Sequence, residues 1–258
     1  MADHISKPLA NIINLCIANS TVPNIWKESL VIPIPKTTPV DITNLRPISL
    51  LSFPAKIFEK VILNQIKDSL ISKYDQHQFG FRPGSSTTCA LLAIQAHTVN
   101  FLDLREISNV IIIAFDLSKA FDRVCHNLLL KKLNFLSHKT HALIKDYLLN
   151  RKNKIVVNGK TGPSYSCHSG VPQGSLLAPY FFGVYFADFL PYSSNSKIVK
   201  FADDSHVIIP IFKKTTHESV LSLIHAQMES ASSWCAKNNQ LLNASKIKIL
   251  NIFFSPYG

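Results

Sequence analysis

The sequence predicts an α+β fold, in which helices and strands follow one another irregularly around a small sheet. Residues 55–71 repeat apolar side chains at helical spacing, which indicates an amphipathic helix. Residues 110–115 form a β-branched run that is typical of a buried strand and ends at Asp116. Asn158 and Gly159 are a turn signal that predicts a β-hairpin. With 258 residues and 47% hydrophobic content, the chain can build one large domain or two lobes that share a core.

The part of the chain before the buried strand contains three further expected features. Prolines interrupt an extended segment at residues 31–35, which favours an edge strand or a linker because proline cannot donate a ladder hydrogen bond. Residues 78–84 have the composition of a loop. The Ser and Thr side chains of residues 85–88 are suited to cap a helix over residues 90–99.

The part after the buried strand continues the mixed pattern. A loop at residues 170–174 leads into an aromatic-rich stretch at residues 180–189. Two short apolar runs flank Asp203 and Asp204, which predicts a second hairpin with both carboxylates at its tip. The other expected elements are helices at 126–135, 141–149 and 218–235, the first hairpin around 154–157, and a closing strand at 248–254.

The charge balance suggests a polyanionic partner. The chain has 27 Lys and Arg residues against 16 Asp and Glu residues, a formal net charge of +11. Such an excess attracts phosphate backbones without sequence preference. A basic, solvated surface is the alternative, since net charge informs about partners and not about fold.

The cysteines and the hydropathy pattern argue against a complete disulfide framework and against a membrane span. The five cysteines are scattered, odd in number and form no CxxC pair, which argues against a zinc site and favours a reducing compartment. The longest uncharged run, residues 175–187, is shorter than the ~20 apolar residues that a membrane helix needs. We therefore expect an intracellular location, cytoplasmic or nuclear, and no membrane partner.

Three carboxylates are the first candidates for chemistry. Asp116 ends a buried strand, and Asp203 and Asp204 lie between two strand segments. If the strands are neighbours, these groups converge at one end of the sheet, where carboxylate oxygens suit Mg²⁺. Two such ions can support an in-line phosphoryl displacement. The alternative from the residues alone is that the Asp pair is a polar turn and Asp116 a helix cap.

The order of the segments carries a family resemblance. Three of them closely resemble motifs A, B and C of reverse transcriptases: residues 115–122 (Phe-Asp-Leu-Ser-Lys-Ala-Phe-Asp), 170–175 (Gly-Val-Pro-Gln-Gly-Ser) and 201–204 (Phe-Ala-Asp-Asp). Residues 45–49 and 78–84 resemble the fingers motifs of the non-LTR, LINE-like branch, and residues 242–246 resemble its motif D region. The resemblance covers nearly the whole chain in the right order, and the upstream motifs look most like Jockey or CR1-type elements.

The resemblance implies the catalytic and metal-binding residues. Asp116 matches the motif A ligand of both metal ions, Asp203 matches its partner in motif C, and Asp204 matches the second motif C carboxylate. The implied cofactor is a pair of Mg²⁺ ions, for which Mn²⁺ can substitute.

The resemblance also implies the residues that contact the incoming dNTP. Arg82 matches a fingers arginine expected on the triphosphate, and Phe121 matches a bulky side chain that excludes a ribose 2′-OH. Gln173 and Gly174 match the motif B loop, and Lys246 is a candidate to protonate or stabilise the leaving pyrophosphate. Arg46 and Lys56 are weaker candidates for the template backbone or the triphosphate.

The implied architecture is that of a right-hand polymerase. Residues 1–109 are expected to form mainly fingers and residues 110–258 mainly palm, with an upstream endonuclease and a C-terminal thumb absent. The implied function is RNA-directed DNA polymerisation in a non-LTR retrotransposon, in which dNTPs are added to the 3′-OH of a DNA primer on an RNA template. The alternative is a truncated, catalytically idle remnant that at most binds RNA or DNA.

Overall fold

The chain folds into two compact units, each assembled from two separate stretches of sequence. The computed structural model describes residues 2–35, 38–39, 41 and 45–253. The first unit comprises Met1–Ser72 and Phe121–Tyr185, and the second comprises Lys73–Ala120 and Phe186–Gly258. The predicted division into fingers (residues 1–109) and palm (residues 110–258) is defined by function and differs in kind from these compact units, so it stays a prediction.

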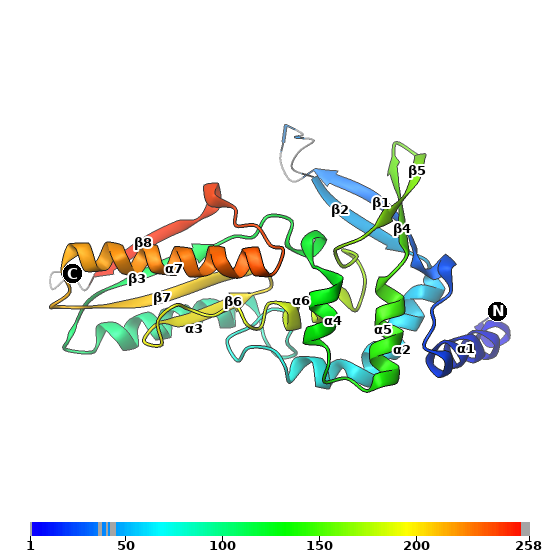
Figure 1. Ribbon diagram of the computed structural model, residues 1–258, viewed down its shortest axis with the longest axis horizontal. Coiled ribbons are helices and arrows are strands. Elements are labelled where there is room, and N and C mark those ends of the chain that lie inside the picture. Colours follow the sequence, from blue (N-terminus) through cyan, green and yellow to red (C-terminus); the bar gives the residue numbers. More distant parts are fainter. Residues whose placement is uncertain (1, 36–37, 40, 42–44, 254–258) are drawn as a thin grey trace. The chain divides into compact units, whose positions relative to one another are not determined.

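The first unit contains a four-stranded sheet with the strand order β2-β1-β4-β5 (Figure 1). Its strands are β1 (Glu28–Pro35), β2 (Leu45–Leu51), β4 (Arg151–Val157) and β5 (Lys160–Cys167). β1 is therefore an inner strand and not the predicted edge strand. Its pairing with β4 ends at Val31, so Pro33 and Pro35 have a ladder neighbour on one side only. The proline rule holds locally, since both prolines lie where β1 has an open edge.

The helices of the first unit pack on one another around aromatic side chains. α1 contacts α5, α2 contacts α6, and α4 contacts both α5 and α6. Phe58, Phe181 and Phe182 are fully buried among these helices. The helices are α1 (Ala2–Asn19), α2 (Phe53–Ile71), α4 (His126–Lys132), α5 (His138–Leu148) and α6 (Ala178–Tyr185).

The second unit contains a sheet with the order β6-β7-β3-β8 and two long helices (Figure 1). The strands are β3 (Ile107–Phe115), β6 (Lys197–Phe201), β7 (Asp204–Phe212) and β8 (Lys248–Phe253), and the helices are α3 (Thr87–Leu102) and α7 (His217–Lys237). Helix α3 begins as predicted from its Ser and Thr residues, because Ser86 Oγ accepts a hydrogen bond from the Cys89 amide. The predicted closing strand is β8, and its expected last residue, 254, lies outside the described residues.

The strand β3 of the second sheet carries buried side chains on both of its faces. Val110 and Ile112 face α3 in a cluster with Val199 and Ile208. Alternate residues point to the opposite face, where Phe115 packs edge-on against Phe189. Phe189 in turn contacts Trp234 of α7. The unbroken β-branched run in the sequence therefore reflects a strand with a helix over each face.

Both predicted hairpins form. β4 and β5 are joined through Asn158 and Gly159, which have φ values of +50° and +75°. Positive φ at both central residues is the conformation that an Asn-Gly turn favours. β6 and β7 pair with Phe201 opposite Asp204, so Ala202 and Asp203 form the tip of the second hairpin. The prediction that both carboxylates lie at the tip is therefore wrong for Asp204, which is the first residue of β7 because it pairs with Phe201.

Within the described ranges, the helices are too short or too polar for any of them to cross a membrane.

Replacing Ile113 by alanine should destabilise the second unit by about 2–5 kcal/mol, because a fully buried side chain leaves a cavity. Its cross-strand partner Ile249 is half exposed, so Ile249→Ala is the matched control and should cost less than about 1 kcal/mol. Urea unfolding followed by circular dichroism measures both values. Equal losses would contradict the assignment of Ile113 to the core.

Candidate functional site

The register of β3 and β7 brings two of the predicted carboxylates to one end of the second sheet. β3 pairs antiparallel with β7, and the last pair is Phe115 with Ser205. Asp116 directly follows Phe115, and Asp204 directly precedes Ser205, so the two side chains leave the sheet at the same end. Asp203 lies next to them in the turn and is half buried.

The two carboxylates influence each other electrostatically. The pKa of Asp204 is raised, first because surrounding protein atoms withdraw part of its hydration and second because the negative charge of Asp116 is near. His206 and Lys246 lower it by a smaller amount. Two carboxylates that repel each other in this way are suited to hold a cation between them.

The carboxylates at this end of the sheet are of the kind that can bind a divalent metal ion when substrate supplies further ligands. Among the described residues, no group of three His, Cys, Asp or Glu side chains is arranged to hold a metal ion by itself. Mg²⁺ commonly uses one or two carboxylates together with substrate phosphates. Asp116 and Asp204, with Asp203 in the adjoining turn, meet that smaller requirement.

The segment that follows α7 forms hydrogen bonds with Asp116. The sequence did not predict this contact. Asn243 donates from its amide side chain to Asp116 Oδ2 at 2.8 Å and from its backbone N–H to the Asp116 carbonyl at 2.9 Å. Lys246 Nζ lies 3.5 Å from the same carboxylate oxygen. The family motif at residues 242–246 singled out this segment, but only the fold shows that its asparagine orients Asp116.

Arg82 lies in the second unit, on the loop between α2 and α3. Its guanidinium donates to the carbonyl of Asp75 at 3.1 Å. The Nε–H of Arg82 is buried and has no hydrogen-bond partner among the described residues. An arginine that is held at one nitrogen and unsatisfied at another retains capacity for an anionic group.

A buried ion pair fixes the start of the same loop. Asp75 Oδ2 and Lys200 Nζ are 2.6 Å apart, and the lysine side chain is fully buried. Burial acts to raise the pKa of Asp75, but the Lys200 ammonium and hydrogen bonds from Lys200 and His77 outweigh burial and hold the pKa below its usual value. Lys200 also donates to the carbonyls of Phe186 and Ala187 at 3.2 Å.

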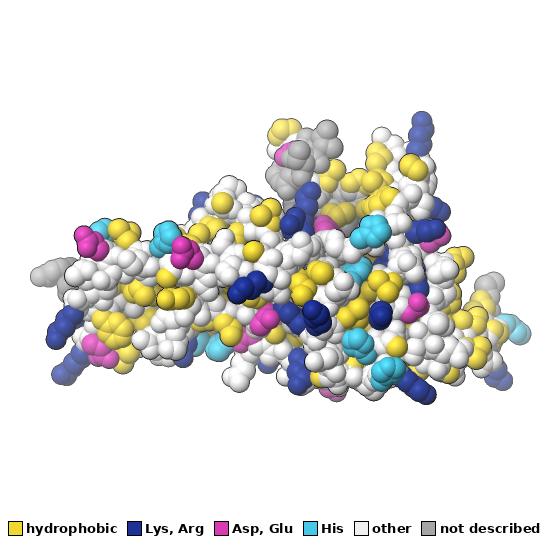
Figure 2. Space-filling view, in the orientation of Figure 1, with side chains coloured by type: hydrophobic (Ala, Val, Ile, Leu, Met, Phe, Trp, Pro, Cys, Tyr) yellow, Lys and Arg dark blue, Asp and Glu magenta, His cyan; other side chains and the backbone are white. Residues whose placement is uncertain are grey.

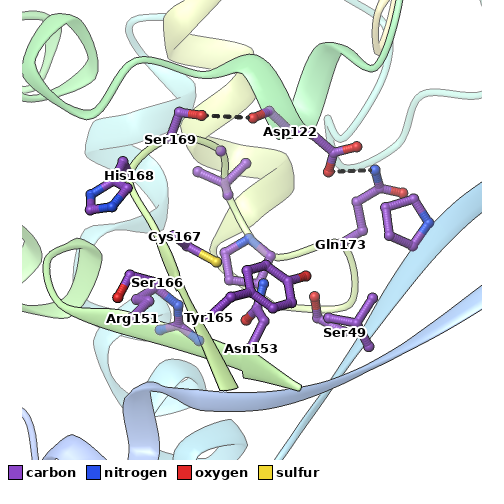
Figure 3. Close-up of a pocket in the computed structure, with 15 residues that line it drawn as sticks. Ser49, Asp122, Arg151, Asn153, Tyr165, Ser166, Cys167, His168, Ser169 and Gln173 are labelled. Carbon is purple, nitrogen blue, oxygen red and sulfur yellow. Dashed lines mark hydrogen bonds between the residues drawn. The ribbon is translucent and has the colours of Figure 1, made fainter. Parts of the chain in front are cut away.

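The remaining predicted dNTP contacts lie in the first unit. Phe121 stacks on Phe182 with a ring separation of 4.6 Å. Gln173 donates from Nε2 to Asp122 Oδ1 at 3.0 Å (Figure 3). Gly174 has a φ of +117°, and a Cβ atom there would lie 2.6 Å from the Ser49 carbonyl oxygen. Only glycine fits this point of the predicted loop.

A pocket of about 290 Å³ borders that loop in the first unit (Figure 3). Ser49, Arg151, Asn153, Tyr165 and Gln173 are among its lining residues. Arg151 is almost fully buried, with Nη1 donating to the Tyr147 carbonyl at 3.4 Å. The pocket gives the 170–174 loop a polar wall that the sequence did not indicate.

A buried network under the loop is a second feature that the sequence did not indicate. Glu59 on α2 accepts hydrogen bonds from the Tyr147 hydroxyl and from the Leu176 amide. Ser175 Oγ lies 3.1 Å from Tyr147 Oη and accepts from the amides of Leu177 and Ala178, where α6 begins. Burial raises the pKa of Glu59 more than these hydrogen bonds lower it. In the sequence, Glu59 is only a charged residue among the apolar residues of α2, so its buried contacts could not be predicted.

Arg46 and Lys56 are both exposed in the first unit, on β2 and in the first turns of α2. Their predicted contacts with template or triphosphate stay predictions. The predicted metal-binding and dNTP-binding roles of the residues described above also stay predictions. Asp116, Asp203, Asp204, Arg82 and Lys246 belong to the second unit, whereas Phe121, Gln173 and Gly174 belong to the first.

A comparison with known protein families identifies the class to which this fold belongs. Residues 34–254 match the family "Reverse transcriptase (RNA-dependent DNA polymerase)", and the chain belongs to that family. It is a reverse transcriptase domain of the non-LTR retrotransposon type.

Similar sequences include mobile-element proteins of Drosophila melanogaster. The chain is 31% identical over 256 residues to the RNA-directed DNA polymerase from mobile element jockey, covering 92% of this chain and 27% of the relative. It is 28% identical over 263 residues to the probable RNA-directed DNA polymerase from transposon BS, covering 96% of this chain and 28% of the relative. The chain therefore spans little more than a quarter of the length of these relatives.

Solved structures share the fold. Telomerase from Candida tropicalis in complex with the TWJ fragment of telomeric RNA matches with a TM-score of 0.64 at 14% identity, over 96% of this chain and 45% of that one. Apo telomerase from the same species, truncated from its C-terminal domain, matches with a TM-score of 0.62 at 15% identity, over 92% of this chain and 52% of that one. The likeness supports the predicted α+β fold of reverse transcriptase fingers and palm.

The Asp75–Lys200 pair should make stability sensitive to acid. Because the folded pKa of Asp75 lies below its unfolded value, the stabilisation is present above about pH 4 and is lost as the pH falls through the folded pKa. Lys200→Met removes the ammonium and leaves a buried carboxylate, which should cost about 3–5 kcal/mol at pH 7. In this variant, the loss of stability on acidification should shrink or change sign.

Urea unfolding between pH 3 and pH 7 tests this expectation. Lys154→Met is the matched control, because Lys154 pairs with Glu28 on an exposed surface. Identical pH profiles for wild type and Lys200→Met would contradict the role of the buried pair.

Proposed function

We propose that the chain is the catalytic domain of an RNA-directed DNA polymerase. The observation that carries the proposal is the β3–β7 register, which places Asp116 and Asp204 at one end of a sheet with Asp203 in the adjoining turn. This placement, in a chain of the reverse transcriptase family, suits nucleotidyl transfer to a primer.

In the proposed reaction, the primer 3′-OH attacks the α-phosphorus of a dNTP. A new P–O bond forms to the primer, the bond between the α-phosphorus and the bridging oxygen breaks, and pyrophosphate leaves while the hydroxyl proton is released. Two bound Mg²⁺ ions would stabilise the attacking and leaving oxygens. Asp116, Asp203 and Asp204 are the residues that would hold these ions, with Asn243 orienting Asp116.

The cationic side chains of the second unit are suited to the triphosphate. Arg82 has a buried Nε–H without a partner among the described residues, so a phosphate oxygen could satisfy it. Lys246 is largely exposed beside Asp116, where its ammonium can offset charge on the leaving pyrophosphate.

An RNA template paired with a DNA primer is the proposed macromolecular partner. The net charge of +11 supplies the electrostatic attraction. Figure 2 shows Lys and Arg side chains spread over the visible face, with fewer Asp and Glu side chains among them. Arg46 and Lys56 are exposed basic side chains and are suited to contact phosphates.

Asp203→Asn should abolish primer extension on an RNA template in Mg²⁺ or Mn²⁺. We expect a loss of at least about 10²-fold, since electrostatic groups at a reacting phosphate typically contribute this much. Glu229→Gln is the control, because Glu229 is an exposed acid on α7 of the same unit and should leave extension unchanged. Extension that survives Asp203→Asn would refute the mechanism. Nucleic-acid binding by a wild type that extends no primer would instead favour the idle remnant.

Phe121→Ala should admit ribonucleotides. The ring is held against Phe182, so its removal opens space where a 2′-OH would otherwise clash. We expect discrimination between dNTPs and rNTPs to fall by about 10- to 100-fold, the range that steric pockets typically provide. Phe121→Tyr retains the bulk and should keep discrimination. Single-nucleotide incorporation with each substrate measures the ratio, and an unchanged ratio in Phe121→Ala would rule out this role.

A further inference from the structure

The side-chain amide of Gln78 is bound to the backbone of the hairpin tip that carries Asp203. Gln78 Nε2 donates to the carbonyl of Ala202 at 3.0 Å, and Gln78 Oε1 accepts from the amide of Ala202 at 3.0 Å. The same oxygen also accepts from the Gly80 amide at 2.8 Å. Gln78 is 2% exposed, so these hydrogen bonds are protected from water.

Main-chain contacts join the rest of the loop to β6. The Phe79 amide donates to the Lys200 carbonyl, and the Lys200 amide donates to the His77 carbonyl, both at 2.8 Å. A Cβ atom on Gly80 would lie 2.2 Å from the Ala202 nitrogen. Any other residue at position 80 would therefore force the loop away from the hairpin tip. The Asp75–Lys200 ion pair also joins the start of this loop to β6.

The conformation of Ala202 explains why such a contact is needed. Ala202 has a φ of +56°, a left-handed conformation that residues with a Cβ atom adopt at a cost. Such a conformation persists only where surrounding contacts determine it. Gln78 binds both polar backbone groups of Ala202, and the peptide that contains the Ala202 carbonyl leads directly into Asp203.

We propose that Gln78 is a positioning residue, which fixes the turn at Ala202 and thereby the direction in which Asp203 leaves the hairpin. This inference rests on the proposed polymerase function for its catalytic consequence. The hydrogen bonds themselves do not depend on that function. The proposal gives Gln78 and Gly80 a physical purpose within the segment Gln78-Phe-Gly-Phe-Arg82, where only Arg82 has been linked to substrate.

Hydrogen exchange of the Ala202 amide tests the contact without any substrate. Gln78→Ala should speed this exchange by about 10-fold, the effect of losing hydrogen bonds of ordinary strength. Gln227→Ala is the matched control in the same unit. Gln227 is also almost fully buried and also accepts a backbone hydrogen bond, from Tyr192, but it does not contact the hairpin tip in any described interaction.

Steady-state primer extension tests the consequence. Gln78→Ala should lower kcat by about 10- to 100-fold, because misplacing a reacting group by about 1 Å has effects of this size. The KM for dNTP and the affinity for template and primer should stay within about twofold, since Gln78 is buried and contacts neither in this scheme. Gln227→Ala should leave kcat unchanged even where the two variants lose equal thermal stability.

The outcomes separate the positioning role from a structural one and from the polymerase proposal. Unchanged exchange at Ala202, or faster exchange with an unchanged kcat, would overturn the positioning role. Faster exchange in a protein whose wild type extends no primer would overturn the polymerase proposal and leave the contact with the hairpin established.

A second variant guards against a failure to fold. If Gln78→Ala does not fold, Gln78→Met is measured in its place, because it keeps about the same side-chain length and leaves no cavity, while it removes both hydrogen bonds to Ala202 and introduces no charge. It should lower kcat by about the same factor as Gln78→Ala. Full activity in Gln78→Met would overturn the positioning role.

Discussion

The antiparallel register of β3 and β7 is the constraint on which the candidate site depends. Side chains alternate between faces along a strand, so a slip of one residue would exchange the side chains on the two buried faces of β3. Val110 and Ile113 are completely buried on opposite faces, so such a slip would have to repack side chains on both faces at once. The packing of two apolar faces therefore fixes where Asp116 and Asp204 meet, although neither contributes to that packing.

The other neighbour of β3 contributes the groups that orient Asp116. β8 pairs with β3 up to Ala114 and Lys248, and the chain just before β8 carries Asn243 and Lys246 to the same end of the sheet. Three segments that lie far apart in sequence thus converge because β3 is an inner strand with partners on both sides. Asn243 therefore holds the Asp116 carboxylate in place, and Lys246 adds a positive charge beside it.

Sequence patterns predicted the elements whose signals are local. The Asn158-Gly159 turn, the β-branched run of β3 and the periodic helix α2 are all present because adjacent residues determine them. β2 was not predicted, since Pro47 obscures its strand pattern, and the inner position of β1 depends on β4 more than a hundred residues later. Asn243, Glu59 and Gln78 likewise have partners remote in sequence, so no local pattern could identify their contacts.

The glycines and the buried polar residues of the two loops play the same structural part in each unit. Each unit contains a loop with a residue at positive φ, Gly174 at +117° in one unit and Ala202 at +56° in the other, and the conformation is costly at Ala202 because that residue has a Cβ atom. Each loop approaches another main chain so closely that a glycine is required, at Gly174 against Ser49 and at Gly80 against Ala202. Beneath each lies a buried polar group, Glu59 in one unit and Gln78 in the other, that binds backbone amides directly. Because backbone strain is retained only where fixed contacts oppose its release, these glycines and buried polar side chains are as necessary to the loops as the carboxylates are to the chemistry.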